Sequence, residues 1–210
     1  MQLQKFGHSC LLVETGEGRL LIDPGTFSAG FEQLDGLTGI LVTHQHPDHL
    51  DVERLRPLLD RNADAQLVAD PATAQILHDD HGIEARVAST GDRIDLGVDV
   101  EVVGQQHAEI HRDLPRIPNA GYVIDGRLLH PGDAIDVTDR QVELLALPTM
   151  APWMRMSEAV DFMRAVQPRA VIPIHEALLR STDLYYNAFR NLGPKDAELR
   201  VLDDGEPIQV

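Results

Sequence analysis

Cysteine and positive charge are both scarce in this sequence. Cys10 is the only cysteine among 210 residues, so no disulfide can form within the chain, and its apolar neighbours predict a buried thiol. There are 18 Lys and Arg against 34 Asp and Glu, which gives a formal net charge of −16. A surface that acidic repels nucleic acids and anionic membranes, so neither is an expected partner.

Long apolar runs and export signals are also missing. No stretch of about 18 apolar residues occurs, and Met1–His8 lacks the charged and apolar regions of a signal peptide. We therefore expect a cytoplasmic protein. The 210 residues, 43% of them hydrophobic, contain no linker, low-complexity segment or repeat, so we expect a single domain over residues 1–210.

Two common catalytic motifs are absent as well. The sequence contains no Gly-x-Ser-x-Gly, which argues against a serine hydrolase built on a nucleophile elbow. It contains no Gly-x-x-x-x-Gly-Lys either, which argues against a nucleotide-binding phosphate loop. Any chemistry is therefore expected from other residue types.

Metal-ligand residue types are concentrated in one stretch of the sequence. The apolar residues 40–42 predict a short strand, and His44, His46, Asp48 and His49 follow it directly. Imidazole and carboxylate are ligands of first-row metals, and a cluster of them is costly to hold without a cation. Alternate residues of an extended chain point the same way, so the first two histidines can bind one ion. The last two lie beyond a bend and can turn to a second ion.

This motif resembles the signature of the metallo-β-lactamase superfamily of hydrolases. The segments Gly7-His8-Ser9-Cys10 and Ile172-Pro173-Ile174-His175 further resemble one branch, the small hydrolases that include ascorbate-6-phosphate lactonase and related uncharacterised metal-dependent hydrolases. The resemblance covers nearly the whole chain. It implies the α/β fold of that superfamily, an αββα sandwich of two mixed β-sheets face to face with helices on the outer faces.

The resemblance also implies seven ligands around two divalent metal ions. Beyond the His-rich motif, the superfamily needs a His, a bridging Asp and a final His, each at the end of a strand. His107, Asp133 and His175 each follow a predicted strand and fill these positions. By this pattern His44, His46 and His107 bind the first ion, Asp48, His49 and His175 bind the second, and Asp133 bridges them. Zinc is the expected metal, while Mn, Fe or Ni would suit the same ligand types.

These ligands predict a binuclear hydrolase. In such a site a hydroxide shared by the two ions attacks the substrate, and Asp48 is the expected catalytic residue that orients the nucleophile or moves its proton. The expected substrate is a small, polar, anionic ester such as a lactone or a phosphoester. Two alternatives stay open: a nuclease or phosphodiesterase of the same fold, and a non-enzymatic metal-binding scaffold module. The sequence does not predict an oligomeric state.

The loop after His107 supplies candidate substrate contacts. His111, Arg112 and Arg116 could hold an anionic group there, or could be charges that simply face solvent. Trp153 lies on a second candidate rim, where its indole either lines the pocket or packs against the following helix.

Two residues near the start of the chain complete the predicted site. His8 is given equal weight as a substrate-pocket residue and as a structural histidine. Asp23 ends a predicted strand before Pro-Gly, where an Asp is often only a turn former. The resemblance implies that Asp23 instead braces the His-rich loop from outside the ligand set.

Alternating and continuous apolar patterns, with turn and cap residues between them, predict the secondary structure. The expected strands cover residues 3–6, 9–14, 19–23, 40–42, 66–69, 86–88, 92–96, 98–104, 120–125, 127–130, 143–147, 170–175 and 198–202. The expected helices cover residues 51–60, with a kink or break at Pro57, 71–80, with Asp70 as cap, a segment that Ser157 caps and Pro168 ends, and 183–192.

Overall fold

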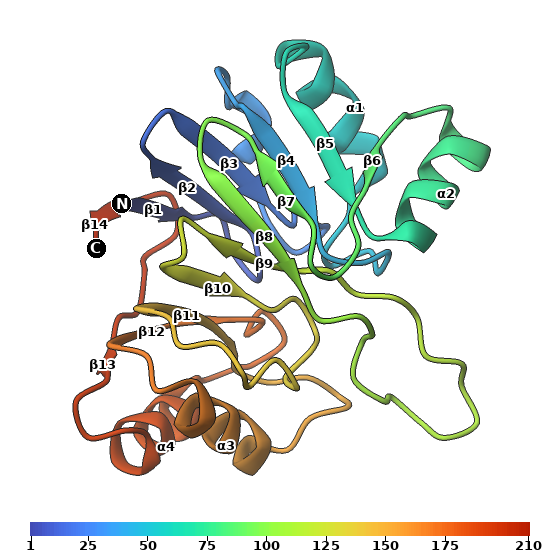
Figure 1. Ribbon diagram of the computed structural model, residues 1–210. Coiled ribbons are helices and arrows are strands. Elements are labelled where there is room, and N and C mark those ends of the chain that lie inside the picture. The colour runs from blue at the N-terminus through green and yellow to red at the C-terminus, as the bar shows by residue number, and fades with distance from the viewer.

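A computed structural model describes residues 1–210 as two seven-stranded mixed sheets packed face to face, with helices on both outer faces (Figure 1). The first sheet has the order β14 (Pro207–Gln209), β1 (Gln2–Lys5), β2 (Leu11–Thr15), β3 (Gly18–Ile22), β4 (Gly39–Val42), β5 (Gln66–Ala69), β6 (Arg86–Val87). The second has the order β13 (Glu198–Leu199), β12 (Ala170–Ile174), β11 (Leu144–Pro148), β10 (Leu128–His130), β9 (Gly121–Ile124), β8 (Asp99–Val103), β7 (Arg93–Asp95). The expected αββα sandwich is confirmed.

The layers follow from the alternation of side chains along each strand. In β3 and β4, Leu20 and Leu41 point into the core between the two sheets, whereas Leu21, Ile40 and Val42 point to the outer core under the helices. Successive side chains of a strand leave opposite faces, so a strand that is apolar on both faces needs a cover on each. This sequence pattern therefore fixes a central position for β3 and β4.

Two helices cover the first sheet. α1 (Val52–Arg61) and α2 (Pro71–His81) contribute Leu55, Leu58 and Leu77 to the outer core. Asp70 caps α2, since its carboxylate accepts hydrogen bonds from the backbone N–H groups of residues 72 and 73. Of the expected kink or break at Pro57, the break is wrong, because α1 runs through Pro57 as one helix whose two buried leucines hold it against the sheet.

The second sheet is covered by α3 (Met156–Val166) and α4 (Asp183–Leu192), which lie on the opposite side of the sandwich from α1 and α2 (Figure 1). The expected cap at Ser157 is also wrong. The helix begins one residue earlier, at Met156, and the backbone N–H of Arg155 donates to Glu158 Oε2 at 2.6 Å. An acid three residues into the helix therefore closes its first turn.

The structure contains two short elements that the sequence pattern does not predict, β14 and a 3-10 helix. Residues 198–202 form only the two-residue β13, while β14 pairs antiparallel with β1 at the edge of the first sheet. A short 3-10 helix, η1 (Phe31–Gln33), also lies between β3 and β4. Edge strands of two or three residues carry too little alternation to be recognised from sequence.

The fold directs many loops to one edge of the sandwich. β3, β4 and β5 run parallel in the first sheet, and β10, β11 and β12 run parallel in the second. Parallel strands end at the same edge of a sheet, and their carboxyl ends are where ligand sites of such sheets are built. None of the helices is long and apolar enough to span a membrane.

Candidate metal centre

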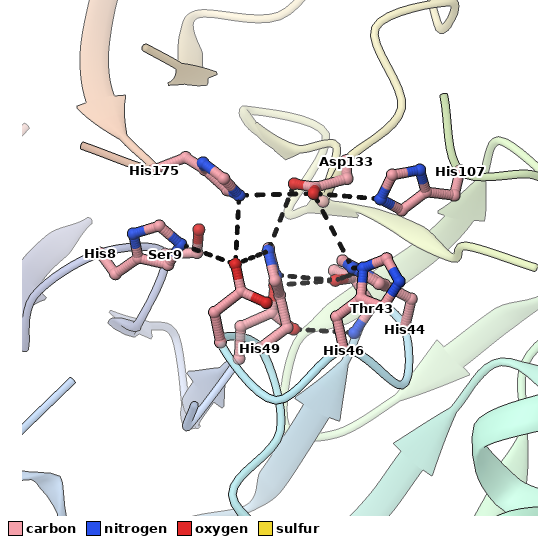
Figure 2. Close-up of polar contacts among 12 residues, drawn as sticks. His8, Ser9, Thr43, His44, His46, His49, His107, Asp133 and His175 are labelled. Carbon is pink, nitrogen blue, oxygen red and sulfur yellow. Dashed lines mark hydrogen bonds and ion pairs between the residues drawn. The ribbon is translucent and has the colours of Figure 1, made fainter. Parts of the chain in front are cut away.

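The candidate ligands meet at this edge, where the ends of four strands deliver them. His44 follows β4, His107 follows β8, Asp133 follows β10 and His175 follows β12, so residues from both sheets face one another across the end of the sandwich (Figure 2). Asp23 directly follows β3 beneath them, and its backbone N–H donates to Leu41 O at 2.9 Å.

The His-rich motif forms a tight turn after β4. The backbone N–H groups of His49 and Leu50 both donate to His46 O, at 2.9 and 3.0 Å, so the chain reverses between His46 and His49. Gly25 is necessary for this packing, because a Cβ there would lie 1.8 Å from Asp48 O. The turn thereby points Asp48 and His49 to one side and His44 and His46 to the other.

Two clusters of metal-ligand types result, each with its ligand atoms within 4.8 Å of one another. The first, here called the His44 cluster, consists of His44, His46, His107 and Asp133. The second, the His49 cluster, consists of His8, Asp48, His49 and His175. The seven residues predicted as ligands are all present in these two clusters, and His8 is the one addition.

Asp133 lies between the two clusters, as Figure 2 shows. Its Oδ2 is 3.2 Å from His107 Nε2 in one cluster and 3.4 Å from His175 Nε2 in the other, and its Oδ1 is 3.3 Å from His49 Nε2. A single carboxylate with its two oxygens is therefore within reach of both clusters, the position that a bridging ligand needs.

The outward-facing nitrogens of four histidines are held by oxygen atoms. His107 Nδ1 donates to Ala108 O at 2.6 Å, and His175 Nδ1 donates to Met150 O at 2.7 Å. The other two outward partners are Thr43 Oγ1, 3.1 Å from His44 Nδ1, and Asp23 Oδ2, 2.7 Å from His49 Nδ1. A histidine that donates through Nδ1 presents Nε2 to the site, which is the arrangement of ligating histidines.

Asp23 lies against the start of the His-rich turn and contacts both Thr43 and His49. Its carboxylate accepts hydrogen bonds from the backbone N–H and the hydroxyl of Thr43, both at 2.8 Å, in addition to the bond from His49. Asp23 is fully buried, and three donors satisfy it. Its position fixes the ring of His49 and the start of the His-rich turn together.

The donor atoms fit a bound metal better than they fit one another. His49 Nε2, His175 Nε2 and Asp133 Oδ1 are buried and make no hydrogen bond, although each faces the space between the clusters. Buried polar atoms are nearly always paired, so three orphans aimed at one space call for a ligand. Imidazole nitrogens and carboxylate oxygens in this number suit one or more divalent first-row ions.

The two clusters differ in how they hold protons. In the His44 cluster, burial and then the charge of His49 hold the pKa of His44 well below its usual value. Burial would also lower the pKa of His175 in the His49 cluster, but the Asp133 and Asp48 carboxylates outweigh it and raise that pKa to about 9. The pKa of His49 is likewise raised, against burial, by Asp133 and Asp23. The carboxylates therefore favour a positive charge on His49 and His175, whereas burial disfavours one on His44.

His8 belongs to the site and not to the core alone. Its Nδ1 accepts from the backbone N–H of Ala177 at 3.4 Å, so its Nε2 carries the proton and donates to Asp48 Oδ2 at 3.2 Å. The backbone carbonyl of His8 accepts from His175 N at 3.2 Å. His8 therefore holds Asp48 and the His175 loop in register.

Backbone strain gathers at the same place. His8, Asp23 and His175 have φ angles of 47°, 51° and 60°. The left-handed region is unfavourable for residues with a Cβ, and such outliers cluster at functional sites. The other two non-glycine residues with positive φ have ordinary reasons, since Asp125 forms a hairpin turn and Gln167 ends α3.

The residues predicted as substrate contacts fall into two groups, those beside the candidate ligands and those that face solvent. Trp153 lies at the centre, where its Nε1 donates to Asp133 Oδ2 at 3.3 Å and its ring is 5.4 Å from that of His107. Arg116 lies beside His107 and donates from Nε to its backbone oxygen at 3.0 Å. His111 and Arg112, in contrast, have side chains that are 58% and 84% exposed next to Asp113, with no contact to the ligands.

Several residues that build the site carry no metal-ligand signal in the sequence. Thr43 links Asp23 to His44, and Asn119 accepts from the backbone N–H of Asp133 at 3.0 Å. Gly132 has φ of +60°, and a Cβ there would lie 2.5 Å from Asn119 Oδ1. The only sequence signal for Thr43 and Gly132 is their location immediately before a predicted ligand, and Asn119 has no such signal.

Sequence comparisons find one matching family and relatives of similar length. Residues 2–175 match the profile of a family described as the Beta-lactamase superfamily domain. The chain is 48% identical over 207 residues to Protein Rv0786c of Mycobacterium tuberculosis, covering 95% of this chain and 96% of that protein. It is 27% identical over 230 residues to a UPF0173 metal-dependent hydrolase of Pyrobaculum arsenaticum, covering 96% of this chain and 92% of the relative.

Solved structures share the fold at lower sequence identity. Igni18, a metallo hydrolase from Ignicoccus hospitalis, superposes with a TM-score of 0.77 at 20% identity and covers 99% of this chain and 97% of its own. An isothiocyanate hydrolase from Delia radicum gut bacteria superposes with a TM-score of 0.76 at 14% identity, covering 100% and 99%. At these identities the likeness concerns the fold.

Proposed function

The chain belongs to the Beta-lactamase superfamily domain family and is a metal-dependent hydrolase of the metallo-β-lactamase fold, and from this premise we propose that it works with two metal ions on a small ester. The His44 cluster would hold one ion and the His49 cluster the other, with Asp133 shared. Zinc is the metal that we propose, since a mixed set of imidazole and carboxylate ligands suits it.

The position of Asp133 is the observation that carries this proposal. If only one cluster bound an ion, buried nitrogens of the other cluster would remain unpaired. The Asp133 carboxylate reaches both clusters, so its negative charge can offset part of the charge of two cations. When bound, a pair of divalent ions supplies a hydroxide nucleophile near neutral pH and a Lewis acid for the substrate oxygen.

Asp48 is the residue that we propose to handle the proton of the reaction. Burial would raise its pKa, but the nearby imidazoles of His175 and His8 lower it, so the carboxylate is ionised and can accept a hydrogen bond from the nucleophile. Its side chain is 22% exposed, against 3% for Asp133, so Asp48 is the acid nearer to solvent. The hydrogen bond from His8 Nε2 to Asp48 Oδ2 would fix the direction in which Asp48 Oδ1 points.

The electrostatics favour a small anionic substrate. The net charge of −16 repels polymers and surfaces that carry negative charge, so we propose neither a nucleic acid nor a membrane as partner. A cation pair and Arg116 beside His107 would make the entrance of the centre locally positive. A lactone or a phosphoester of low molecular mass meets both conditions.

The test is a substrate panel with metal-loaded protein. Lactones, phosphomonoesters, phosphodiesters, thioesters, β-lactams and single-stranded RNA would be compared by kcat/KM, with metal content measured on the same samples. We expect fastest turnover on a small lactone or phosphoester and about two metal equivalents per chain. Preference for RNA would favour a nuclease, and no turnover by fully loaded protein would favour a metal-binding scaffold.

We further propose that residues 1–210 act as one domain. The last strand, β14, pairs with the first, β1, so the two ends of the sequence complete one sheet (Figure 1). Limited proteolysis that released a stable, separately folded fragment would contradict this.

A further inference from the structure

A cavity of about 170 Å³ opens directly beside the His44 cluster. Its wall includes the side chains of His46 and His107, and the rest comes from the loop that follows His107. That loop joins β8 to β9 and extends away from the sheets (Figure 1). The remaining lining residues are Ala108, Ile110, Leu114, Pro115, Arg116 and Ile117.

The lining of this cavity is aliphatic apart from the two histidines and one arginine. Ile110 and Leu114 remain 44% and 54% exposed although both side chains are large and apolar. They are two of the eight large hydrophobic residues that are exposed in this chain, and both line the cavity. Exposed apolar side chains that gather at a site indicate contact with an apolar group of a ligand.

The loop is held in place by its own hydrogen bonds. His107 N donates to Ile117 O at 3.0 Å, Arg116 Nε donates to His107 O at 3.0 Å, and Gln106 forms a bridge with Pro118. The two arms of the loop are therefore tied together at its base, next to the metal centre. The cavity between them is preformed, as small-molecule sites usually are.

We propose that this cavity is a substrate subsite that binds a short aliphatic chain next to the bond that is cleaved. The proposal rests on the hydrolase function proposed above and narrows its substrate to esters or lactones that carry such a chain. Arg116, at the edge of the cavity, would bind a polar or anionic group on the same substrate. The substrate is then a small amphiphilic molecule instead of a uniformly polar one.

The size and position of the cavity favour a substrate over a protein partner. A volume of about 170 Å³ is below the range of drug-sized pockets, which suits a few carbon atoms. A stable protein interface would need on the order of 800 Å² on each partner. The wall is also continuous with two metal-ligand histidines, so a molecule in the cavity has its end at the reaction centre.

The first experiment measures how kcat/KM depends on chain length. Metal-loaded protein would be assayed with p-nitrophenyl acetate, butanoate and hexanoate, and with γ-butyrolactone, γ-hexalactone and γ-octalactone, each relative to its spontaneous hydrolysis. Burial of one methylene corresponds to about a fourfold gain, so kcat/KM should rise by roughly tenfold between the first two members of at least one series. The series that responds identifies the side of the ester that carries the chain.

Two variants test whether this gain in kcat/KM comes from the cavity. Leu114→Gln and Ile110→Gln keep an exposed side chain of similar size, and both should reduce the ratio of kcat/KM between the longer and the shortest substrate to less than about threefold. Leu184→Gln is the matched control, because Leu184 is 68% exposed on α4, away from the loop. It should leave the ratio as in the wild type.

A binding measurement tests the subsite separately from catalysis. The sequence has one tryptophan, Trp153, next to His107, so its fluorescence can report on acetate, butanoate and hexanoate bound to metal-loaded protein. In the wild type the dissociation constant should fall from acetate to hexanoate. In the Leu114→Gln variant it should stay the same along the series. Flat responses in both assays overturn the subsite. Binding that improves with chain length, without turnover of any ester, would instead overturn the proposed hydrolysis and keep the subsite.

Discussion

The two clusters of the metal centre use the same ligand types but differ in protonation. The pKa values of His44 and His46 are lowered, chiefly by burial, so these imidazoles are neutral around pH 7. The pKa of His175 is instead raised to about 9, because Asp133 and Asp48 outweigh the effect of burial. An ion that binds His44 and His46 therefore displaces no proton from them near pH 7, whereas an ion that binds His175 competes with a proton.

This difference comes from the placement of the carboxylates. His49 lies between Asp23 on its Nδ1 side and Asp133 on its Nε2 side, and His175 lies 3.4 Å from both Asp48 and Asp133. Metal ligands must lose their protons before they bind. We therefore expect the His44 cluster to bind the first ion and the His49 cluster the second.

The largest effect is expected from Asp133→Ala, which removes the residue that both clusters share. The variant should retain less than one metal equivalent. Loss of a residue that only hydrogen-bonds to a metal ligand costs about 10- to 100-fold in activity, and Asp133→Ala should cost more than that. Metal analysis and kcat on the best substrate check this. The matched control is Asp161→Ala, an exposed acid on α3. Retention of two ions by Asp133→Ala would mean that the clusters are independent.

The next largest effect separates the clusters from each other. His46→Ala and His175→Ala should each reduce metal content from about two equivalents to about one, and both should abolish hydrolysis. His46 is partly exposed, so its replacement should leave far-UV circular dichroism unchanged. A His46→Ala protein with near-full activity at limiting metal would show that the first ion does not need this ligand.

Asp23→Asn should weaken one cluster more than the other. The amide cannot accept all three hydrogen bonds that Asp23 now receives, so the ring of His49 loses its brace. Affinity for the second ion should fall by about 10- to 100-fold, with a smaller change for the first. Asp70→Asn is the control, since Asp70 is a buried acid that caps α2 away from the ligands. Equal losses for both ions would remove the distinction between the clusters.

Lowering the pH should release the ion of the His49 cluster first. Below a pKa of about 9 an ion must displace the proton of His175, so its affinity should fall by about tenfold per pH unit for each proton displaced. His44 and His46 have lowered pKa values and begin to compete only at more acidic pH. Chelator competition at pH 6, 7 and 8 measures both affinities, and parallel slopes would contradict the comparison.

The smallest effect concerns the two arginines of the loop. Arg116→Ala should raise KM severalfold and lower kcat less, as expected when binding is lost equally from the ground state and the transition state. Arg112, whose side chain is 84% exposed beside Asp113, should change KM less than Arg116 does. Steady-state kinetics on the same ester compares them, and equal increases in KM would place Arg112 in contact with the substrate.

Much of the fold could be predicted from the sequence because its strongest signals are local. The paired strands expected at residues 9–14 and 19–23, the cap at Asp70 and the apolar strands before the ligands all depend on neighbouring residues. The expectations that were wrong, the break at Pro57 and the cap at Ser157, were local preferences that packing of α1 and α3 against the sheets outweighed.

The site was predictable as a set of residue types but not as a geometry. The ligand pattern named the residues that meet at the edge of the sandwich, because they follow strand ends or lie in the turn after β4. The roles of Thr43 and Asn119 depend on contacts between segments far apart in the sequence, which no local pattern encodes. The apolar character of the loop after His107 was hidden by its charged residues, two of which face solvent.

The positive φ angles of His8, Asp23 and His175 have a consequence for the speed of metal capture. Each angle costs on the order of 1–3 kcal/mol, and backbone hydrogen bonds of the chain itself help to offset that cost, from Asp23 N to Leu41 O and from His175 N to His8 O. We therefore expect the folded chain to set the positions of the ligands. Capture of an ion should then be limited by diffusion and by the departure of water and protons.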